Sequence, residues 1–195
     1  LGATTINRWS YSTAKAAVEH YILAHHQANG LEFMIFRPFN FYGPRLDSLG
    51  AGRVITVFLD RFFAGEPVQV HGDGKQTRTF CYIEDAARGM VAGALIDRAW
   101  NTVLNIGSDE EHSILELAHI MKRVGKFQSD IKLVSYQEAF CGSYEDIPRR
   151  VPRLARIRDL VGWEATTALE AGLESTIDHF RTQLKAREGT SATPG

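Results

Sequence analysis

Apolar and polar positions follow two different periods along this chain, and their order predicts alternating helices and strands. Residues 11–29 carry Ala, His and Glu at helical spacing, and Gly30 follows where a helix C-cap is expected. Residues 31–37 form a short, mostly apolar run, which is typical of a strand in a parallel sheet covered by helices. The same patterns predict further helices at 53–64, 84–94, 113–125, 154–161 and 169–184, and strands at 67–71, 77–83 and 103–106. The predicted fold class is therefore α/β, without an internal repeat.

Composition describes one folded unit and excludes several classes of partner. Of the 195 residues, 44% are hydrophobic, which is enough to bury a core, and the net charge of −1 argues against a general nucleic-acid binder. Local clusters of Arg can still bind one small phosphorylated ligand. The chain has no apolar run of about 18 residues, and its start is unlike a signal peptide, so we expect no membrane partner and a cytoplasmic location.

Cysteine and histidine are not spaced as metal ligands or as a disulfide framework. Cys81 and Cys141 are far apart in sequence, so both are predicted to be reduced thiols. His20, His25 and His26 share one predicted helix but do not form an i, i+4 pair with a third ligand. The sequence therefore predicts no metal.

The clearest chemical feature is Tyr11 followed by Lys15 at the head of the first predicted helix. Positions i and i+4 share a helix face, so the Lys15 ammonium can stabilise negative charge on the Tyr11 oxygen. Such a phenol can take a proton from a substrate hydroxyl while hydride leaves the same carbon, or return one to a ketone. The pair indicates nicotinamide-dependent oxidation; the alternative is a surface helix with an ordinary Tyr and Lys.

A second candidate region follows the predicted strand at 31–37. Residues 38–45 read Pro-Phe-Asn-Phe-Tyr-Gly-Pro-Arg and begin where that strand ends. In open α/β sheets the loops at the carboxyl ends of strands form the ligand crevice, so this loop is a candidate site.

Four blocks of residues, taken in order, resemble one known family. They are Tyr11-xxx-Lys15, residues 37–45 (Arg-Pro-Phe-Asn-Phe-Tyr-Gly-Pro-Arg), residues 72–78 (Gly-Asp-Gly-Lys-Gln-Thr-Arg) and residues 105–107 (Asn-Ile-Gly). Their order and spacing are similar to the extended short-chain dehydrogenase/reductase family, which comprises nucleotide-sugar epimerases, dehydratases and decarboxylases. The resemblance covers nearly the whole chain and implies an enzyme that keeps NAD tightly bound and acts on a nucleotide-diphosphate sugar, with UDP as the favoured nucleotide.

The resemblance also implies two interleaved units. Residues 1–45 and 79–108 would be the carboxyl-terminal part of a Rossmann-type parallel sheet that binds NAD. Residues 46–78 and 109–185 would form a smaller α/β domain that binds the nucleotide sugar, and residues 186–195 a flexible tail. The helix at 11–29 would pack against its twin in a homodimer.

Part of the family's cofactor site is expected to be absent from residues 1–195. The chain begins with Leu1 and contains no G-x-x-G-x-x-G turn. The family's glycine-rich turn, its acidic ribose-binding residue and its Ser or Thr partner to the tyrosine would all precede Leu1. We therefore expect these residues alone to bind NAD poorly or not at all and to lack activity. An alternative from another class is a non-catalytic fragment that only self-associates.

The matched positions imply roles for individual residues. Tyr11 would be the acid/base, and Lys15 would support it while donating to the nicotinamide ribose. Pro38 lies where the family's backbone passes the nicotinamide, and Asn40 where a side-chain amide meets the sugar diphosphate. The other residues at or near positions that face phosphate, sugar, base or ribose are Arg53, Gln69, Arg78, Tyr144 and Arg150. Each also has a plain interpretation, as a turn-forming Asn, a solvated surface Arg or a polar strand residue facing water.

The resemblance leaves open which reaction completes the cycle after oxidation of sugar C4. Residues 37–49 and 144–150 look like the decarboxylase domain of bifunctional polymyxin-resistance enzymes, and residues 53–55 and 105–112 resemble UDP-xylose-forming decarboxylases. In that subfamily the residue matching Arg150 acts as an acid or faces the carboxylate, and since a guanidinium stays charged we emphasise an electrostatic role. UDP-sugar 4-epimerases share most of these blocks, including an Arg before the final Gly162-Trp163. We rank decarboxylation of UDP-glucuronate first, 4-epimerisation second and 4,6-dehydration third.

Overall fold

The computed structural model describes the chain except residues 1–4, 7–8, 46, 51, 141–146 and 192–195, and the side chains of 140 and 188–191. Its helices are α1 (Ser10–Asn29), α2 (Val54–Phe63), α3 (Ile83–Ala94), α4 (Ile114–Gly125), α5 (Tyr136–Phe140), α6 (Ala155–Val161), α7 (Leu169–Ser191) and the 3-10 turn η2 (Asp97–Ala99). Its strands are β1 (Met34–Pro38), β2 (Phe41–Tyr42), β3 (Val68–His71), β4 (Thr77–Thr79), β5 (Cys81–Tyr82), β6 (Thr102–Ile106), β7 (Glu111–Ser113), β8 (Ile131–Val134) and β9 (Arg149–Arg150).

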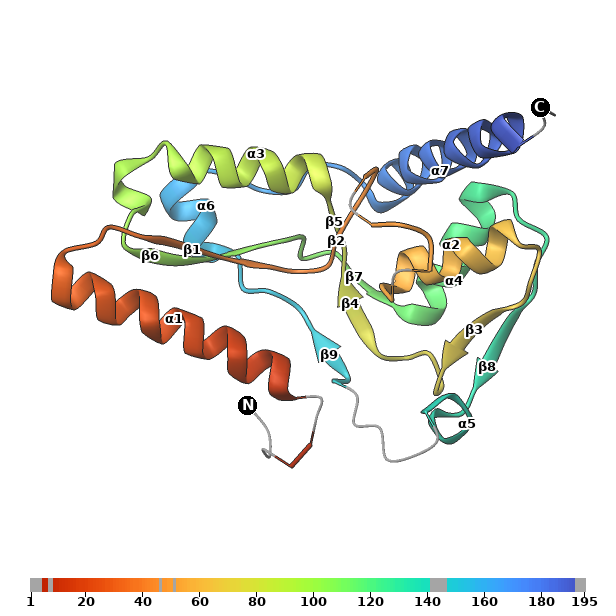
Figure 1. Cartoon of the computed structure of the whole chain (residues 1–195), viewed down its shortest axis with the longest axis horizontal. Helices are drawn as coiled ribbons and strands as arrows, with labels where there is room; N and C mark the ends of the chain where they lie inside the picture. The colour runs from red at the N-terminus through yellow and green to blue at the C-terminus, as the bar shows by residue number, and fades with distance from the viewer. Residues whose placement is uncertain (1–4, 7–8, 46, 51, 141–146, 192–195) are drawn as a thin grey trace.

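Strands β1 and β6 form a parallel pair between two layers of helix. Their register joins Met34 to Thr102 and Pro38 to Ile106. Helix α1 lies on one side of the pair, and α3 and α6 lie on the other (Figure 1). We call the hydrophobic cluster on the α3 side the first core; it contains Cys81, Ala86, Ala99, Leu104, Ile106, Leu154, Ile157 and Trp163. Gly89 allows α3 to approach closely, because a Cβ there would lie 2.6 Å from Trp163.

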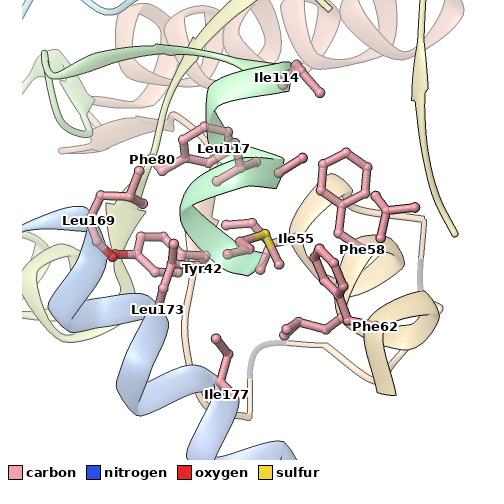
Figure 2. Close-up of a cluster of buried hydrophobic side chains, with 14 of the residues drawn as sticks. Tyr42, Ile55, Phe58, Phe62, Phe80, Ile114, Leu117, Leu169, Leu173 and Ile177 are labelled. Carbon is pink, nitrogen blue, oxygen red and sulfur yellow. The ribbon is translucent and has the colours of Figure 1, made fainter. Parts of the chain in front are cut away.

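A larger second core lies among α2, α4 and α7. Apolar residues recur along α2 at 55, 58, 59 and 62, the spacing of one helix face. Figure 2 shows Ile55, Phe58 and Phe62 in one cluster with Leu117 of α4 and with Leu173 and Ile177 of α7. The second core contains Tyr42, Ile55, Phe58, Leu59, Phe62, Val68, Val70, Phe80, Tyr82, Ile114, Leu117, Ala118, Met121, Leu169, Leu173, Ile177 and Phe180. The parallel pair β3 and β8 contributes Val68 and Val70 to it.

The chain passes from one sheet to another between Thr79 and Cys81. Strand β4 pairs with β7 and β9, whereas β5 pairs with β2. The side chain of Phe80 packs in the second core and that of Cys81 in the first. The single strand expected at 77–83 is therefore two short strands, because the pairing partners change at Phe80, from β7 and β9 before it to β2 after it.

Two tyrosines connect these short strands to α7. The Tyr42 hydroxyl donates to the Leu169 carbonyl at 3.2 Å, across 127 residues of sequence. The Tyr82 and Ser175 hydroxyls are hydrogen-bonded at 2.9 Å. A Cβ at Gly172 would overlap the Tyr42 hydroxyl, so only glycine lets α7 lie this close. Burial, with smaller effects from Cys81 and Tyr82, raises the pKa of Tyr42, which keeps its hydroxyl a donor.

Several expected elements are present with small shifts in their ends. Helix α1 ends at Asn29 and Gly30 is its left-handed cap at φ 66°, as the sequence predicts. Ser113 caps α4, since its hydroxyl accepts from Glu116 N at 3.1 Å and its own N–H donates to the Glu116 carboxylate at 2.8 Å. The sequence did not predict β2, β7, β8, β9 or α5. Helix α7 continues to Ser191, beyond the expected end near Leu184 and into the range predicted as a flexible tail.

Helix α6 packs on α3 and β6, and its residue Ile157 belongs to the first core. In the sequence this helix falls in the range 109–185, which was expected to bind the nucleotide sugar, whereas in the structure it packs with elements of the other expected unit. The assignment of each range to cofactor or sugar stays a proposal. Among the helices in the described part of the chain, none has both the length and the apolar character needed to cross a membrane.

Asp85 joins the start of α3 to the connection between α6 and α7. Its side chain is fully buried and accepts from Thr166 N at 3.2 Å, Thr167 N at 2.8 Å and the Arg88 guanidinium. Its backbone carbonyl accepts from Trp163 Nε1 at 3.0 Å. Burial on its own raises the pKa of Asp85, but the hydrogen bonds from Thr167 and Thr166 and the charge of Arg88 outweigh it, so the pKa lies below its ordinary value.

Replacing Asp85 by Asn should lower the free energy of unfolding by about 2–4 kcal/mol, because an amide N–H₂ would face backbone donors that now meet a carboxylate. The lowered folded-state pKa means that this stabilisation is present at neutral pH. It is lost as pH falls from the ordinary carboxylate pKa through the folded value. Urea unfolding measured at several pH values tests both effects. The exposed Asp97 provides the control, and Asp97→Asn should change stability by less than about 0.5 kcal/mol.

Candidate active site

Tyr11 and Lys15 lie one turn apart at the start of α1. The Tyr11 side chain is 71% exposed, and the Lys15 Nζ atom lies 5.6 Å from the centre of its ring. The two groups therefore share a helix face, as their spacing predicts, and both are accessible to a ligand. The cation lies over the ring face, which also favours the pair electrostatically.

Helix α1 is fixed to β1 largely by polar contacts, since it has no fully buried side chain. Its half-buried residues form a single stripe toward the sheet: Ser12, Ala16, Glu19, Ile22 and His26. Within that stripe, Arg37 Nε donates to Glu19 Oε1 at 2.7 Å, and Arg37 Nη2 donates to the second carboxylate oxygen. This hydrogen-bonded pair is the main reason that the pKa of Glu19 lies below its usual range.

These contacts place Tyr11 at the carboxyl end of β1. His26 is hydrogen-bonded to the Leu31 carbonyl at 2.7 Å, while Glu19 meets Arg37 further along the strand, so α1 and β1 run in opposite directions. Tyr11 precedes Glu19 by eight residues, which is about 12 Å of helix. The phenol therefore extends toward the end of the sheet at which Pro38 and the following loop begin.

The loop after β1 is held by backbone hydrogen bonds to both neighbouring strands. Pro38 is exposed and pairs in register with Ile106 of β6, and Phe39 N donates to the Ile106 carbonyl at 3.0 Å. Cys81 N donates to the Asn40 carbonyl at 3.2 Å. Asn40 has φ 43°, a left-handed conformation that Asn tolerates better than most residues. This turn aims the Asn40 side chain at β4.

Asn40, Arg78 and Arg150 form one polar cluster. The Asn40 amide donates to the Thr79 carbonyl at 2.7 Å, and Arg150 Nη2 donates to Asn40 Oδ1 at 2.6 Å. Arg78 of β4 is directly opposite Arg150 of β9 in register, so the two side chains share a sheet face. Arg78 is buried, and its Nη1 donates to the Thr77 carbonyl at 2.7 Å. The planar guanidinium forks of Arg78 and Arg150 suit the paired oxygens of phosphate or carboxylate.

The other residues selected from the sequence lie in different surroundings. Arg53 precedes α2 and forms an ion pair with Asp47 at 2.7 Å. Gln69 is exposed on β3, where its partner in register is Lys132. Tyr144 lies outside the described residues. The structure thus brings Asn40, Arg78 and Arg150 together, and it gives Arg53 a carboxylate partner.

The sequence alone did not single out His112, which lies on β7 directly opposite Arg78. The His112 ring is half-buried, and its Nε2 lies 3.0 Å from Glu110 Oε1. A three-residue strand is too short to show the alternation that identifies strands, so only pairing with β4 reveals this neighbour. In the described ranges, His, Cys, Asp and Glu side chains do not form a group of three that could hold a metal ion.

Comparison with known proteins identifies the family. A model of the NAD dependent epimerase/dehydratase family matches residues 3–107, which is more than half of the chain and includes the Tyr–Lys pair, the loop after β1 and Arg78. The chain belongs to this family. The resemblance inferred from the four sequence blocks is confirmed, and the family's cofactor is NAD.

Individual relatives cover the chain almost completely but are themselves longer. UDP-N-acetyl-alpha-D-glucosaminuronate decarboxylase of Bacillus cytotoxicus is 34% identical over 92% of this chain and 56% of its own length. UDP-glucuronic acid decarboxylase 1 of Xenopus tropicalis is 32% identical over 96% of this chain and 42% of its own length. The crystal structure of a UDP-glucose 4-epimerase from Thermotoga maritima, with UDP-glucose, superposes with a TM-score of 0.80 at 27% identity, covering 89% of this chain and 54% of that one. The chain spans about half the length of these relatives, and the α/β Rossmann-type fold is confirmed.

Replacing Glu19 by Gln should loosen α1 against β1. Because the ion pair is partly exposed, we expect only about 0.2–1 kcal/mol of global stability to be lost, but faster amide hydrogen exchange along α1. Since the folded-state pKa of Glu19 is lowered, acidification below the ordinary carboxylate range should produce the same loosening in the unmodified chain. Exchange detected by mass spectrometry, with Glu32→Gln as a control on an exposed neighbouring carboxylate, makes the comparison. Unchanged exchange in Glu19→Gln would show that packing alone holds the helix.

Proposed function

We propose that residues 1–195 supply the catalytic Tyr–Lys pair and the nucleotide-sugar site of an NAD-dependent enzyme that oxidises sugar C4, and that its reaction is decarboxylation of UDP-glucuronate. The observation that carries this proposal is the cluster of Asn40, Arg78 and Arg150 beyond the carboxyl end of β1, the end toward which Tyr11 extends. A diphosphate and a sugar carboxylate are the anions that such a cluster fits. The Bacillus cytotoxicus relative, named for UDP-N-acetyl-alpha-D-glucosaminuronate, supports decarboxylation of a UDP-linked sugar acid, and the Xenopus tropicalis relative, named for UDP-glucuronic acid, supports UDP-glucuronate as the substrate.

The described residues fit one end of NAD. The exposed Tyr11 hydroxyl and Lys15 ammonium offer donors to a nicotinamide ribose, and the exposed Pro38 offers an apolar surface to the ring. The sequence contains no G-x-x-G-x-x-G turn, so a cradle of that kind for the pyrophosphate is not supplied by residues 1–195. When bound, NAD would accept hydride from sugar C4.

In the proposed mechanism, Lys15 stabilises the phenolate form of Tyr11, which takes the proton from the C4 hydroxyl as the ketone forms and so becomes a neutral phenol. The 4-ketone is β to the sugar carboxylate, so carbon dioxide can leave as an enolate develops. Arg150 then stabilises the charge that moves from the carboxylate onto the enolate oxygen, in a role that needs no proton transfer from the guanidinium. Arg78, the more buried of the two arginines, is proposed to bind the diphosphate, with Asn40 as a neutral donor beside it.

A second candidate function is UDP-sugar 4-epimerisation. The superposition with the UDP-glucose 4-epimerase of Thermotoga maritima favours it, because 89% of this chain is covered at a TM-score of 0.80. The same residues would serve both reactions up to the ketone, after which an epimerase returns hydride to the opposite face. Dehydration at C5 and C6 ranks third, and a non-catalytic fragment that only self-associates is the alternative from another class.

Product mass, with chromatography to resolve C4 epimers of equal mass, decides between these reactions. The test protein carries, ahead of Leu1, the glycine-rich half of the Bacillus cytotoxicus relative, and it receives NAD with UDP-glucuronate or, separately, UDP-glucose. We expect loss of carbon dioxide from UDP-glucuronate, and Tyr11→Phe should lower kcat about 100- to 10,000-fold. Conversion of UDP-glucose to its C4 epimer at unchanged mass would instead establish the epimerase. Residues 1–195 without the added half should show no turnover, and tight NAD binding by them would contradict an incomplete cofactor site.

We also propose that α1 pairs with the same helix of a second copy. On its outward face, exposed small or aromatic residues recur at intervals of three and four: Ala14, Ala17, Tyr21, Ala24 and Ala28. This is the spacing of a helix–helix seam, and it contains no charged residue. A two-fold pairing would bury the same stripe on both chains, and the small side chains would allow the helices to approach closely.

Sedimentation of the 195-residue chain tests this pairing. We expect dimer at micromolar concentration, and Ala17→Arg should shift the protein to monomer because it places a charge in the seam. Gln183→Arg adds the same charge on the exposed side of α7 and should leave the dimer intact. A monomer at all concentrations in the unmodified chain would exclude the seam.

We propose a cytoplasmic location for this activity, and Cys81 takes no part in the chemistry. Cys81 is a free, fully buried thiol. Burial, with a smaller effect from Asp85, raises its pKa to about 12, so the reactive thiolate is scarce. The thiol therefore serves packing in the first core rather than redox chemistry.

A further inference from the structure

We infer that the ion pair between Glu111 and Arg149 is a positioning device that holds Arg150 in the anion-binding cluster. Neither Glu111 nor Arg149 lies in that cluster, and the sequence indicated neither of them as a site residue. The inference rests on the proposed function, because it concerns how Arg150 reaches its ligand. Strand register, hydrogen bonds and charge each support it.

Strand β9 consists of only Arg149 and Arg150, and an irregular connection then leads to α6 (Figure 1). It pairs in parallel with β4, so that Arg149 lies opposite Thr77 and Arg150 opposite Arg78. Successive residues of a strand point to opposite faces. Arg150 therefore shares the face of Arg78, while Arg149 projects from the other face of the same small sheet.

On that other face, Arg149 reaches across β4 to the outer strand β7. Its Nε donates to the two Glu111 carboxylate oxygens at 3.0 and 3.2 Å, and its Nη2 donates to Glu111 Oε2 at 2.8 Å. Thr77, on β4 between them, donates its hydroxyl to Glu111 Oε1. The hydrogen bonds from Arg149 and then Thr77 hold the pKa of Glu111 below its usual range, so the carboxylate is charged at neutral pH.

Strand β9 is only two residues long and lies at the edge of the described sheet, so few backbone hydrogen bonds hold it to β4. The Glu111–Arg149 pair joins β7 to β9 across β4 and so adds a side-chain connection on the face opposite Arg150. An anion that binds between the arginines would then find both guanidinium groups already in place.

The first test is binding of UDP-glucuronate to the 195-residue chain by titration calorimetry. Glu111→Gln keeps the side-chain size but removes the charge, and it should raise Kd about 2- to 10-fold. Arg149→Lys keeps the charge but loses the planar fork and should give a smaller increase. Glu66→Gln, which removes the carboxylate partner of Arg61 at the far end of α2, is the matched control and should leave Kd unchanged.

A double-mutant cycle separates positioning from a general loss of structure. If Glu111 acts through Arg150, then Glu111→Gln should have little further effect on Kd in an Arg150→Ala background. The exchanged pair, Glu111→Arg with Arg149→Glu, should recover much of the affinity. Fully additive effects of Glu111→Gln and Arg150→Ala would overturn the inference.

Separate measurements distinguish a wrong positioning role for Glu111 and Arg149 from a wrong proposed function. If the unmodified chain does not bind UDP-glucuronate, the proposed function is contradicted. The positioning role is then read from amide hydrogen exchange at residues 149 and 150, which should be faster in Glu111→Gln than in Glu66→Gln. Equal exchange in the two variants would overturn the inference whatever the ligand.

Discussion

The change of sheet between Thr79 and Cys81 is the constraint on which the rest of the molecule depends. Asn40 is hydrogen-bonded to the chain on both sides of this point: its side-chain amide donates to the Thr79 carbonyl, and its own carbonyl accepts from Cys81 N. Phe80, between them, packs in the second core while Cys81 packs in the first. Because one short segment contributes a side chain to each core, neither core can move far at this point without displacing Asn40. The candidate site therefore lies where the two halves of the hydrophobic interior are joined.

This arrangement explains why the site is rich in charge although the protein as a whole is nearly neutral. The short sheet of β4, β7 and β9 stands at the border of the second core, and its two faces carry different chemistry. One face presents Arg78 and Arg150, and the other carries the Glu111–Arg149 ion pair. The ion pair on one face is neutral as a whole, whereas the other face carries two positive charges. A local group of positive side chains can therefore bind an anion although the net charge of the protein is close to zero.

Local signals made much of the fold predictable from the sequence, whereas long-range pairing did not. Gly30 and Ser113 mark a helix end and a helix start through their own backbone and side-chain chemistry, so both boundaries were predicted. The contact of Lys15 with the Tyr11 ring is likewise set by helix geometry. By contrast, β9 is too short to show an alternation of apolar and polar residues, and it is a strand only because it pairs with β4. The spacing of Asp47 and Arg53 in the sequence likewise did not predict that they form an ion pair. The proximity of Arg78 to Arg150 was expected only through the family resemblance.

The hydrogen bond from Tyr42 to Leu169 has a consequence for the order in which the chain folds. Tyr42 follows Asn40 by two residues, yet its hydroxyl is held by a helix that begins 127 residues later. During synthesis the loop that carries Asn40 therefore leaves the ribosome long before its support does. Contacts of such large sequence separation form slowly, since a long loop must close first. Helix α7, made well over a hundred residues after Asn40, thus completes the support of the loop that carries Asn40.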